Sequence, residues 1–375
     1  MNDVFAGFAT ICFVFQTSFL FGDSDNVLAE IDVPKLGDRL SVPIESDGRS
    51  LIYILDTGAT RTCVAKSIAA KWQPIRHEPL HALTETVQVP IYERPEAESF
   101  AGMVLRRRTE LYAQDFRSIS DFTGIEIDGV LGMNDLKRFV IQIDFDNGKL
   151  RILRSAAREL GEKFRLSSKR GCPTIDIRVN ELEIDANIDT GASSDVLLTA
   201  NRFDQLVEQK QIIIGVSTQI ATATGVATVS KGTLQNKMSL GSFEHSGCRV
   251  TKTQFNAVGL GYLSRFVVTF DFPHEAMYLK PGKAYDRPAY HDALGVGVLF
   301  QNKQIVVSDV NSNSPAEDAA IQQGDVLKQI DGKDTTNLSL FEIRRRFCQD
   351  GKRLKLQFER EGKLRDVTIT LRKYD

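Results

Sequence analysis

The sequence is short of cysteine pairs and of net charge. Only five cysteines occur among 375 residues, and none of them forms a CxxC pair, which excludes a dense disulfide framework and a zinc knuckle. Basic and acidic residues number 47 and 49, so the formal net charge is −2 and gives no global sign of nucleic-acid binding. With 42% hydrophobic and 26% charged residues, the chain is predicted to be globular, with two or three domains.

Charge is missing altogether from Val4–Gly22, close to the N-terminus. The segment VLA at 27–29 fits a small-residue cleavage site. We therefore expect residues 1–29 to be a signal peptide and the protein to be exported to the periplasm, the cell surface or the medium. The alternative is an uncleaved N-terminal anchor, since the apolar stretch is just long enough to span a bilayer. A membrane is expected as a partner only in that second case.

The histidines do not form a convincing metal site. The segment HEPLH, from His77 to His81, matches the HExxH zinc motif, which requires both histidines on one face of a helix. Pro79 lies between them and would cost about 3 kcal/mol in a helix interior. We interpret the segment as a surface loop and expect neither a metal nor a cofactor. A zinc metalloprotease is the alternative, to be tested by bound zinc that is lost on His77→Ala.

The sequence does contain an internal repeat. The stretches LIYILDTGAT (51–60) and LEIDANIDTGAS (182–193) each lead an apolar segment into the tripeptide Asp-Thr-Gly. Further along, LKRFVIQIDF (136–145) and LSRFVVTFDF (263–272) share Leu, Arg, Phe, Val, Asp and Phe at the same places. Because the order and the approximate spacing of these motifs are preserved, the chain is predicted to contain a duplicated unit of about 120 residues.

Each copy of the repeat is predicted to be mostly β. Residues 182–188 alternate between apolar and polar side chains, which is typical of a half-buried strand. The segments IQIDF and KLRIL, and likewise VVTFDF and AMYLK, are predicted to be strand pairs joined by turns. Short helices are expected at 65–72, 133–139 and 199–209.

The two repeated aspartates, Asp56 and Asp189, follow apolar segments, although an ionised carboxylate is costly to bury. Two carboxyl groups held face to face cannot both ionise cheaply, so one keeps its proton and the pair titrates as a unit. The charged partner can deprotonate a water while the protonated partner polarises a carbonyl oxygen. One aspartate from each copy would supply such a pair, which predicts hydrolysis of an amide without a metal.

With these residues in view, the two copies resemble the lobes of pepsin/retropepsin-type aspartic proteases. The segments GVLGMNDLKRF (129–139) and NAVGLGYLSRF (256–266) are similar to the apolar-Gly segment and the following helix of that family. The resemblance covers about residues 40–280. It implies a mainly β fold with duplicated retropepsin-like (acid-protease) β-barrel lobes at 30–155 and 156–282.

The same resemblance assigns roles to single residues. It implies that Asp56 and Asp189 are the catalytic dyad. The supporting residues of the two catalytic loops would be Thr57, Gly58, Thr190 and Gly191. The segment 221–232 is a candidate flap hairpin of the second lobe, whereas the first lobe offers only Tyr92 at the corresponding place.

After Pro281 the pattern changes, and residues 283–375 resemble a PDZ domain, a small β-barrel with one or two helices. The stretch SPAEDAAIQQGDVLKQIDG (314–332) is similar to PDZ domains of bacterial secreted proteases, and SLFEIRRRF (339–347) would be the groove helix. Such domains bind peptide C-termini by strand addition. The resemblance places the carboxylate-binding loop at Leu294, Gly295, Val296 and Gly297.

Together these features predict an exported aspartic endopeptidase that hydrolyses peptide bonds in protein substrates. Its PDZ domain would recruit the C-termini of substrates or partners. The alternative is a non-catalytic PDZ adaptor built on inactive protease lobes. No nucleic-acid partner is expected in either case.

Overall fold

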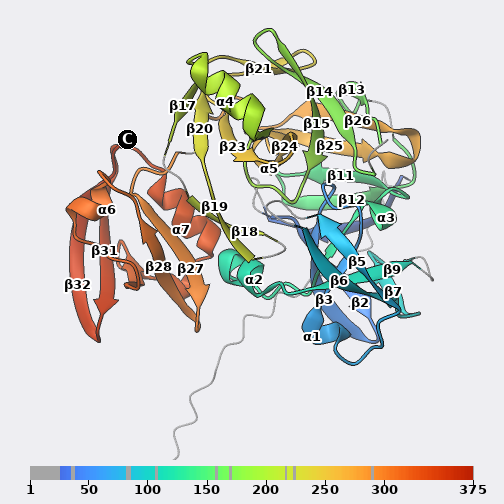
Figure 1. Cartoon of the computed structure of the whole chain (residues 1–375), viewed down its shortest axis with the longest axis horizontal. Helices are drawn as coiled ribbons and strands as arrows, with labels where there is room; N and C mark the ends of the chain where they lie inside the picture. The colour runs from blue at the N-terminus through green and yellow to red at the C-terminus, as the bar shows by residue number, and fades with distance from the viewer. Residues whose placement is uncertain are drawn as a thin grey trace, which may run out of the picture.

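The computed structural model describes residues 26–34, 39–81, 86–105, 109–156, 159–168, 171–215, 218–222, 225–288 and 291–374. Its structure is mainly β. Figure 1 shows three groups of strands, coloured blue to teal, green to light orange, and dark orange to red along the chain. We call them the first unit, the second unit and the C-terminal unit.

The first unit is built on a nine-stranded sheet. Its strands are β2 (Ser41–Ser46), β3 (Arg49–Leu55), β4 (Cys63–Ala65), β5 (Arg76–His81), β6 (Thr86–Glu93), β7 (Glu98–Phe100), β8 (Met103–Val104), β9 (Glu110–Gln114) and β10 (Gly129–Leu131). They lie in the order β5-β6-β9-β4-β10-β3-β2-β7-β8. The helices of this unit are α1 (Lys66–Ala69), α2 (Arg117–Thr123) and α3 (Met133–Leu136).

The second unit repeats this arrangement. Its strands are β14 (Thr174–Val179), β15 (Leu182–Asp189), β16 (Val196–Thr199), β17 (Ile212–Ile214), β20 (Lys231–Leu234), β21 (Met238–Leu240), β22 (Phe243–His245), β23 (Arg249–Thr253) and β24 (Ala257–Gly259). Their order is β17-β20-β23-β16-β24-β15-β14-β21-β22, which matches the first sheet strand for strand. The helices are α4 (Ala200–Glu208) and α5 (Leu260–Leu263), and β18 (Thr218–Thr222) and β19 (Gly225–Val229) form a separate hairpin.

A six-stranded sheet joins the two units. Its strands are β1 (Val27–Asp32), β11 (Val140–Asp144), β12 (Lys149–Leu153), β13 (Glu162–Arg165), β25 (Phe266–Asp271) and β26 (Ala276–Pro281), with the short 3₁₀ helix η1 (Phe272–His274) before β26. The order is β1-β12-β11-β25-β26-β13, so three strands come from each side of the duplication. At its centre β11 pairs antiparallel with β25, and Ile141 lies opposite Phe270.

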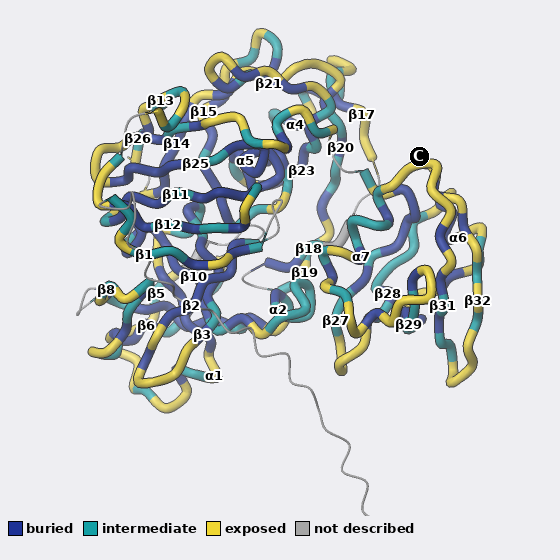
Figure 2. Tube along the Cα trace, turned by 180° about the vertical axis from the view of Figure 1, so that it is seen from behind, coloured by how far each residue is buried: buried dark blue, intermediate teal, exposed yellow. Residues whose placement is uncertain are grey.

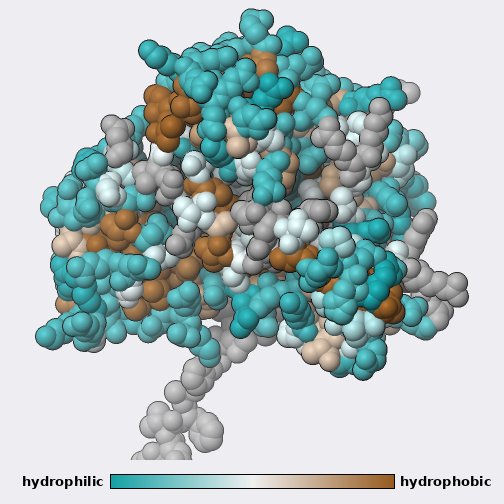
Figure 3. Space-filling model, in the orientation of Figure 1, coloured by the Kyte–Doolittle hydropathy of each residue, from teal (hydrophilic) through white to brown (hydrophobic). Residues whose placement is uncertain are grey.

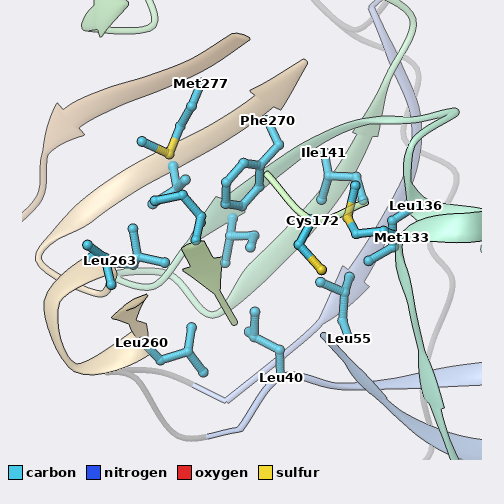
Figure 4. Close-up of a cluster of buried hydrophobic side chains, with 14 of the residues drawn as sticks. Leu40, Leu55, Met133, Leu136, Ile141, Cys172, Leu260, Leu263, Phe270 and Met277 are labelled. Carbon is cyan, nitrogen blue, oxygen red and sulfur yellow. The ribbon is translucent and has the colours of Figure 1, made fainter. Parts of the chain in front are cut away.

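One apolar core runs beneath this shared sheet and through both units. Figure 4 shows Leu55 and Ile141 of the first unit in the same cluster as Leu260 and Phe270 of the second. All four side chains are fully buried. Because burial of a Leu, Ile or Phe side chain contributes about 1.5–3 kcal/mol, this common core holds the two units together as one body.

The C-terminal unit has its own core and its own sheet. Its strands are β27 (Val296–Gln301), β28 (Gln304–Val310), β29 (Val326–Ile330), β30 (Lys333–Asp334), β31 (Arg353–Arg360) and β32 (Lys363–Thr370). They lie in the order β27-β28-β29-β31-β32, with β30 beside β29. The helices are α6 (Pro315–Asp318), α7 (Leu340–Phe347) and the 3₁₀ helix η2 (Thr335–Asn337). A capping box between Ser339 and Glu342 fixes the start of α7.

The expected closed β-barrels are not found in the part of the chain that the structure describes. Closure of a barrel requires the first and last strands of a sheet to pair. The strand orders instead form open paths, from β5 to β8, from β17 to β22 and from β27 to β32. The fold is therefore mainly β with open sheets. Figure 2 shows the exposed turns along their rims and the buried strands between them.

Two other expectations bear on local structure. The HEPLH segment forms most of β5, a strand rather than a loop, because it pairs along its length with β6. A strand separates His77 from His81 along its axis, and no group of three or more metal-ligating side chains occurs among the described residues. The short helices expected at 65–72, 133–139 and 199–209 are present as α1, α3 and α4.

The predicted signal peptide or anchor falls almost entirely on residues 1–25, outside the described part of the chain. Among the residues that are described, no helix is long and apolar enough to cross a membrane. The predicted cleavage point after Ala29 lies inside β1, where Ala29 pairs with Ile152. Cleavage there would divide this strand.

Candidate functional site

Asp56 and Asp189 lie at the junction of the two units, each at the end of a strand. Asp56 follows β3, and Asp189 is the last residue of β15. Each strand has a parallel neighbour, so that Leu55 pairs with Leu131 on β10 and Asp189 pairs with Gly259 on β24. The same pairing on both sides brings the two Asp-Thr-Gly turns face to face.

Thr57 and Thr190 tie the two turns together. The amide of Thr57 donates to Oγ1 of Thr190 at 3.0 Å, and the amide of Thr190 donates to Oγ1 of Thr57 at 3.1 Å. Each hydroxyl then donates across the junction, Thr57 to the carbonyl of Ile188 at 2.6 Å and Thr190 to that of Leu55 at 2.8 Å. Both threonines are fully buried. With these four bonds, the buried amide and the buried hydroxyl of each threonine all have hydrogen-bond partners.

The glycines let the two carboxyl groups approach closely. The amides of Gly58 and Gly191 each donate at 2.8 Å to Oδ1 of the aspartate in their own turn. A Cβ atom on Gly58 would lie 2.6 Å from Cγ of Asp189, and one on Gly191 would lie 2.4 Å from Oδ2 of Asp56. Only a residue without a side chain fits between each turn and the opposite carboxyl group.

The surroundings of the two carboxyl groups favour one proton held between them. Burial raises the pKa of Asp56, and burial together with the charge of Asp56 raises the pKa of Asp189 to about 8. The carboxyl groups also hydrogen-bond to each other, an arrangement that one protonated and one ionised group can make. Such a pair can donate and accept a proton at the same place, which is the property required of an acid–base site.

A buried ionic network supports the first turn. Thr62 accepts a bond from the amide of Gly132 and donates one to Asp135. Asp135 forms an ion pair with Arg94, which also pairs with Glu98 at 3.2 Å. These three charged side chains are almost completely buried. The network fixes the segment after β10 against the loop that follows Asp56.

Two residues at the site are not part of any sequence motif and were not predicted. Arg39 donates to the carbonyl of Gly191 at 3.3 Å, and its charge opposes the rise in the pKa of Asp56. Cys172 places its Sγ 3.1 Å from the carbonyl of Gly58, and burial raises the pKa of this free thiol to about 12. Both contacts cross between the two units, so a pattern within either copy of the repeat could not reveal them.

The expected flap hairpin has a counterpart in the structure. Strands β18 and β19 pair from Thr218 opposite Val229 to Thr222 opposite Gly225, close to the predicted segment 221–232. Tyr92, the first-unit candidate, instead lies on β6 with its side chain buried in the core.

The predicted carboxylate-binding loop lies where β27 begins. The amides of Leu294 and Gly295 both donate to the carboxylate of Asp292 at 3.0 Å, so these two donors already bind an internal acid. Val296 and Gly297 are the first residues of β27. Gly297 faces β28 so closely that a Cβ atom would lie 2.1 Å from Oδ1 of Asp309.

Comparison with known proteins identifies part of this chain. Residues 292–371 match the family model for the PDZ domain. A curated relative, a probable CtpA-like serine protease from Staphylococcus saprophyticus, is 30% identical over 121 residues, which is 31% of this chain and 25% of the relative. Among solved structures, the photosystem II D1 C-terminal processing protease matches with a TM-score of 0.22 and 19% identity, over 25% of this chain and 26% of that one.

The C-terminal unit is therefore a PDZ domain, as its sequence predicts. The chain spans about a quarter of the length of the proteins it matches.

The expectation of an aspartic endopeptidase is contradicted by these comparisons. The curated relative is named as a serine protease, a class that uses a hydroxyl nucleophile rather than a water held between two acids. Aspartyl protease and retropepsin-like lobes, which the two Asp-Thr-Gly motifs implied, find no support among the proteins matched. The motif defines a local turn and its carboxylate, and the same turn is compatible with more than one function.

Proposed function

We propose that this protein binds the C-termini of other proteins through its PDZ domain and takes part in protein processing. The observation that carries this proposal is the match of residues 292–371 to the PDZ family. Peptides bind such domains as an added strand in a groove between a strand and a helix. Here β27 is the edge strand of its sheet and packs beside α7, which supplies both sides of such a groove.

The test is binding of a library of labelled peptides with free C-termini to the full chain, measured by fluorescence anisotropy. We expect a subset to bind, and we expect the same peptides to lose binding when the terminal carboxylate is amidated. Equal binding of amidated and free peptides would contradict recognition of the C-terminus.

We further propose that Asp56 and Asp189 form the acid–base site of the protein, with Thr57, Gly58, Thr190 and Gly191 as its supporting residues. The shared proton and the bonds across the junction support this role. On this view residues 30–155 and 156–282 are two copies of one unit that carry the site between them, and residues 283–375 form the separate peptide-binding domain. Export of the mature protein remains part of the same proposal.

The acid–base role is tested by following the ionisation of the two carboxyl groups from pH 4 to 9 in the wild type and in the isosteric variants Asp56→Asn and Asp189→Asn. We expect the wild type to show one carboxyl group that ionises near pH 8, and we expect this ionisation to be lost in Asp189→Asn. Ser194→Ala serves as a control close to the second turn. The same ionisation in the wild type and in both aspartate variants would remove the pair from the site.

A further inference from the structure

Helix α2 lies where the three units meet. It belongs to the first unit, yet it packs against β27 and α7 of the PDZ domain and against the hairpin β18–β19 of the second unit. Figure 1 shows the helix between the PDZ strands and the first unit, with the hairpin next to it, and Figure 2 shows the same neighbours from behind. One short helix therefore contacts both sides of the PDZ groove.

The contact is made by the C-terminal end of α2. The ring centre of Phe122 lies 4.0 Å from the guanidinium carbon of Arg344 on α7. Arg344 in turn donates to the carbonyl of Val298 on β27 at 2.7 Å, so it bridges the groove from helix to strand. Gly124, which ends α2, is close enough to Leu340 of α7 that a Cβ atom would lie 3.2 Å from its Cδ1.

The helix also contacts Arg39 and the hairpin β18–β19. Arg39, which contacts the carbonyl of Gly191, also lies 5.8 Å from the ring centre of Phe122. Ile119 of α2 shares an apolar cluster with Ala221 of β18. Phe122 is thus held between an arginine of the PDZ groove and an arginine of the acid–base site.

We propose that α2 is the resident occupant of the PDZ groove and that a protein C-terminus binds only by displacing it. This inference rests on the proposed function of the PDZ domain. The two cannot occupy the groove together, because the added strand of a ligand would need the free edge of β27 and the face of α7 that α2 now covers. The ligand that fits is an extended C-terminal segment with an aromatic or large apolar side chain, which would replace Phe122 against Arg344.

Displacement of α2 would also remove contacts in the first and second units. The hairpin β18–β19 would lose the helix on which Ala221 packs, and Arg39 would lose its contact with Phe122. Binding in the groove is thereby coupled to the hairpin β18–β19 and to Arg39, whose charge acts on Asp56.

The first experiment compares peptide affinity between the full-length wild type and Phe122→Ser. A closed groove lowers the apparent affinity in proportion to the fraction of open molecules. Loss of a partly buried aromatic–cation contact opens the groove, so we expect Phe122→Ser to bind the same C-terminal peptide roughly five- to tenfold more tightly. Arg117→Ser is the matched control on the exposed side of the same helix, and we expect it to bind like the wild type.

The second experiment locks the helix in place. A Cβ atom on Gly124 would lie 3.8 Å from Cβ of Leu340, the mean separation in a disulfide. We expect the double variant Gly124→Cys/Leu340→Cys to lose peptide binding at least tenfold when oxidised and to regain it on reduction. Hydrogen exchange should show faster exchange in 117–123 and 225–229 when the peptide binds to the wild type.

The outcomes separate the two proposals. Equal affinity of wild type and Phe122→Ser, together with undiminished binding by the oxidised double variant, would overturn the role of α2 and leave recognition of C-termini intact. Absence of peptide binding in the wild type, in Phe122→Ser and in the reduced double variant would overturn recognition of C-termini, and the role of α2 with it.

Discussion

Thr57 and Thr190 exchange hydrogen bonds across the junction of the two units, each amide donating to the hydroxyl of the other. The reciprocity means that neither turn can keep its position without the other. The acid pair is therefore held by the junction as well as by the bonds within each turn.

Removal of the Thr57 hydroxyl should destabilise the hydrogen bonds between the two turns. Thr57→Val keeps the shape of the side chain but leaves the amide of Thr190 and the carbonyl of Ile188 without partners. Because an unsatisfied buried group costs about 1–3 kcal/mol, we expect a loss of about 2–4 kcal/mol in the free energy of unfolding, measured with urea. Thr57→Ser retains the hydroxyl and should lose much less. Equal stability of the Val and Ser variants would contradict the bonding described.

A methyl group on the second turn should force the acid pair apart. In Gly191→Ala the new Cβ would lie 2.4 Å from Oδ2 of Asp56. Overpacking of this kind typically costs 1–3 kcal/mol, and we expect a loss of about that size, measured by thermal unfolding. Gly215→Ala is the control, since its nearest neighbour would be 3.7 Å away. A tolerated Gly191→Ala would show that the turns are further apart than the structure indicates.

The shared proton should make stability fall as pH rises. The pKa of Asp189 is about 8 in the folded protein and near the ordinary value of 3.8 when unfolded. Between these values the folded protein keeps a proton that the unfolded chain has lost, so the free energy of unfolding decreases with pH and levels off above about pH 8. Asp189→Asn removes the titrating group and should flatten this slope. Equal slopes in the two proteins from pH 4 to 8 would be inconsistent with a raised pKa.

The buried ionic network predicts a large effect from Arg94. Its loss leaves Glu98 and Asp135 as uncompensated buried charges, so Arg94→Gln should cost about 3–5 kcal/mol in the free energy of unfolding. Arg117→Gln, at a side chain that is 88% exposed, should change stability by less than about 0.5 kcal/mol. Denaturant titration of both variants measures the two free energies of unfolding. Similar losses in the two variants would mean that the buried network does not contribute more to stability than an exposed ion pair.

The repeat and the paired turns could be predicted from the sequence, because each turn is encoded within a few residues and occurs twice. Arg39 could not be predicted, since its partner Gly191 lies in the other copy and no local pattern links them. The strand at HEPLH was missed for a related reason, because β5 exists through its pairing with β6. The aspartic endopeptidase prediction was wrong because the Asp-Thr-Gly motif specifies a turn and not a reaction. The packing of α2 on the PDZ groove has no sequence signature, because nothing in the residues around Phe122 distinguishes it from other aromatic residues of the chain.

The antiparallel pairing of β11 with β25 protects a strand edge that a single copy of the repeat would expose. Like strands from the two copies meet there, with three strands of the shared sheet on each side. A single copy would expose β11 as an open edge, and the partner that fits this edge with the same register is a second identical molecule. In this chain the second copy of the repeat takes that place, so β25 covers the edge of β11 and no second molecule is needed to complete the sheet.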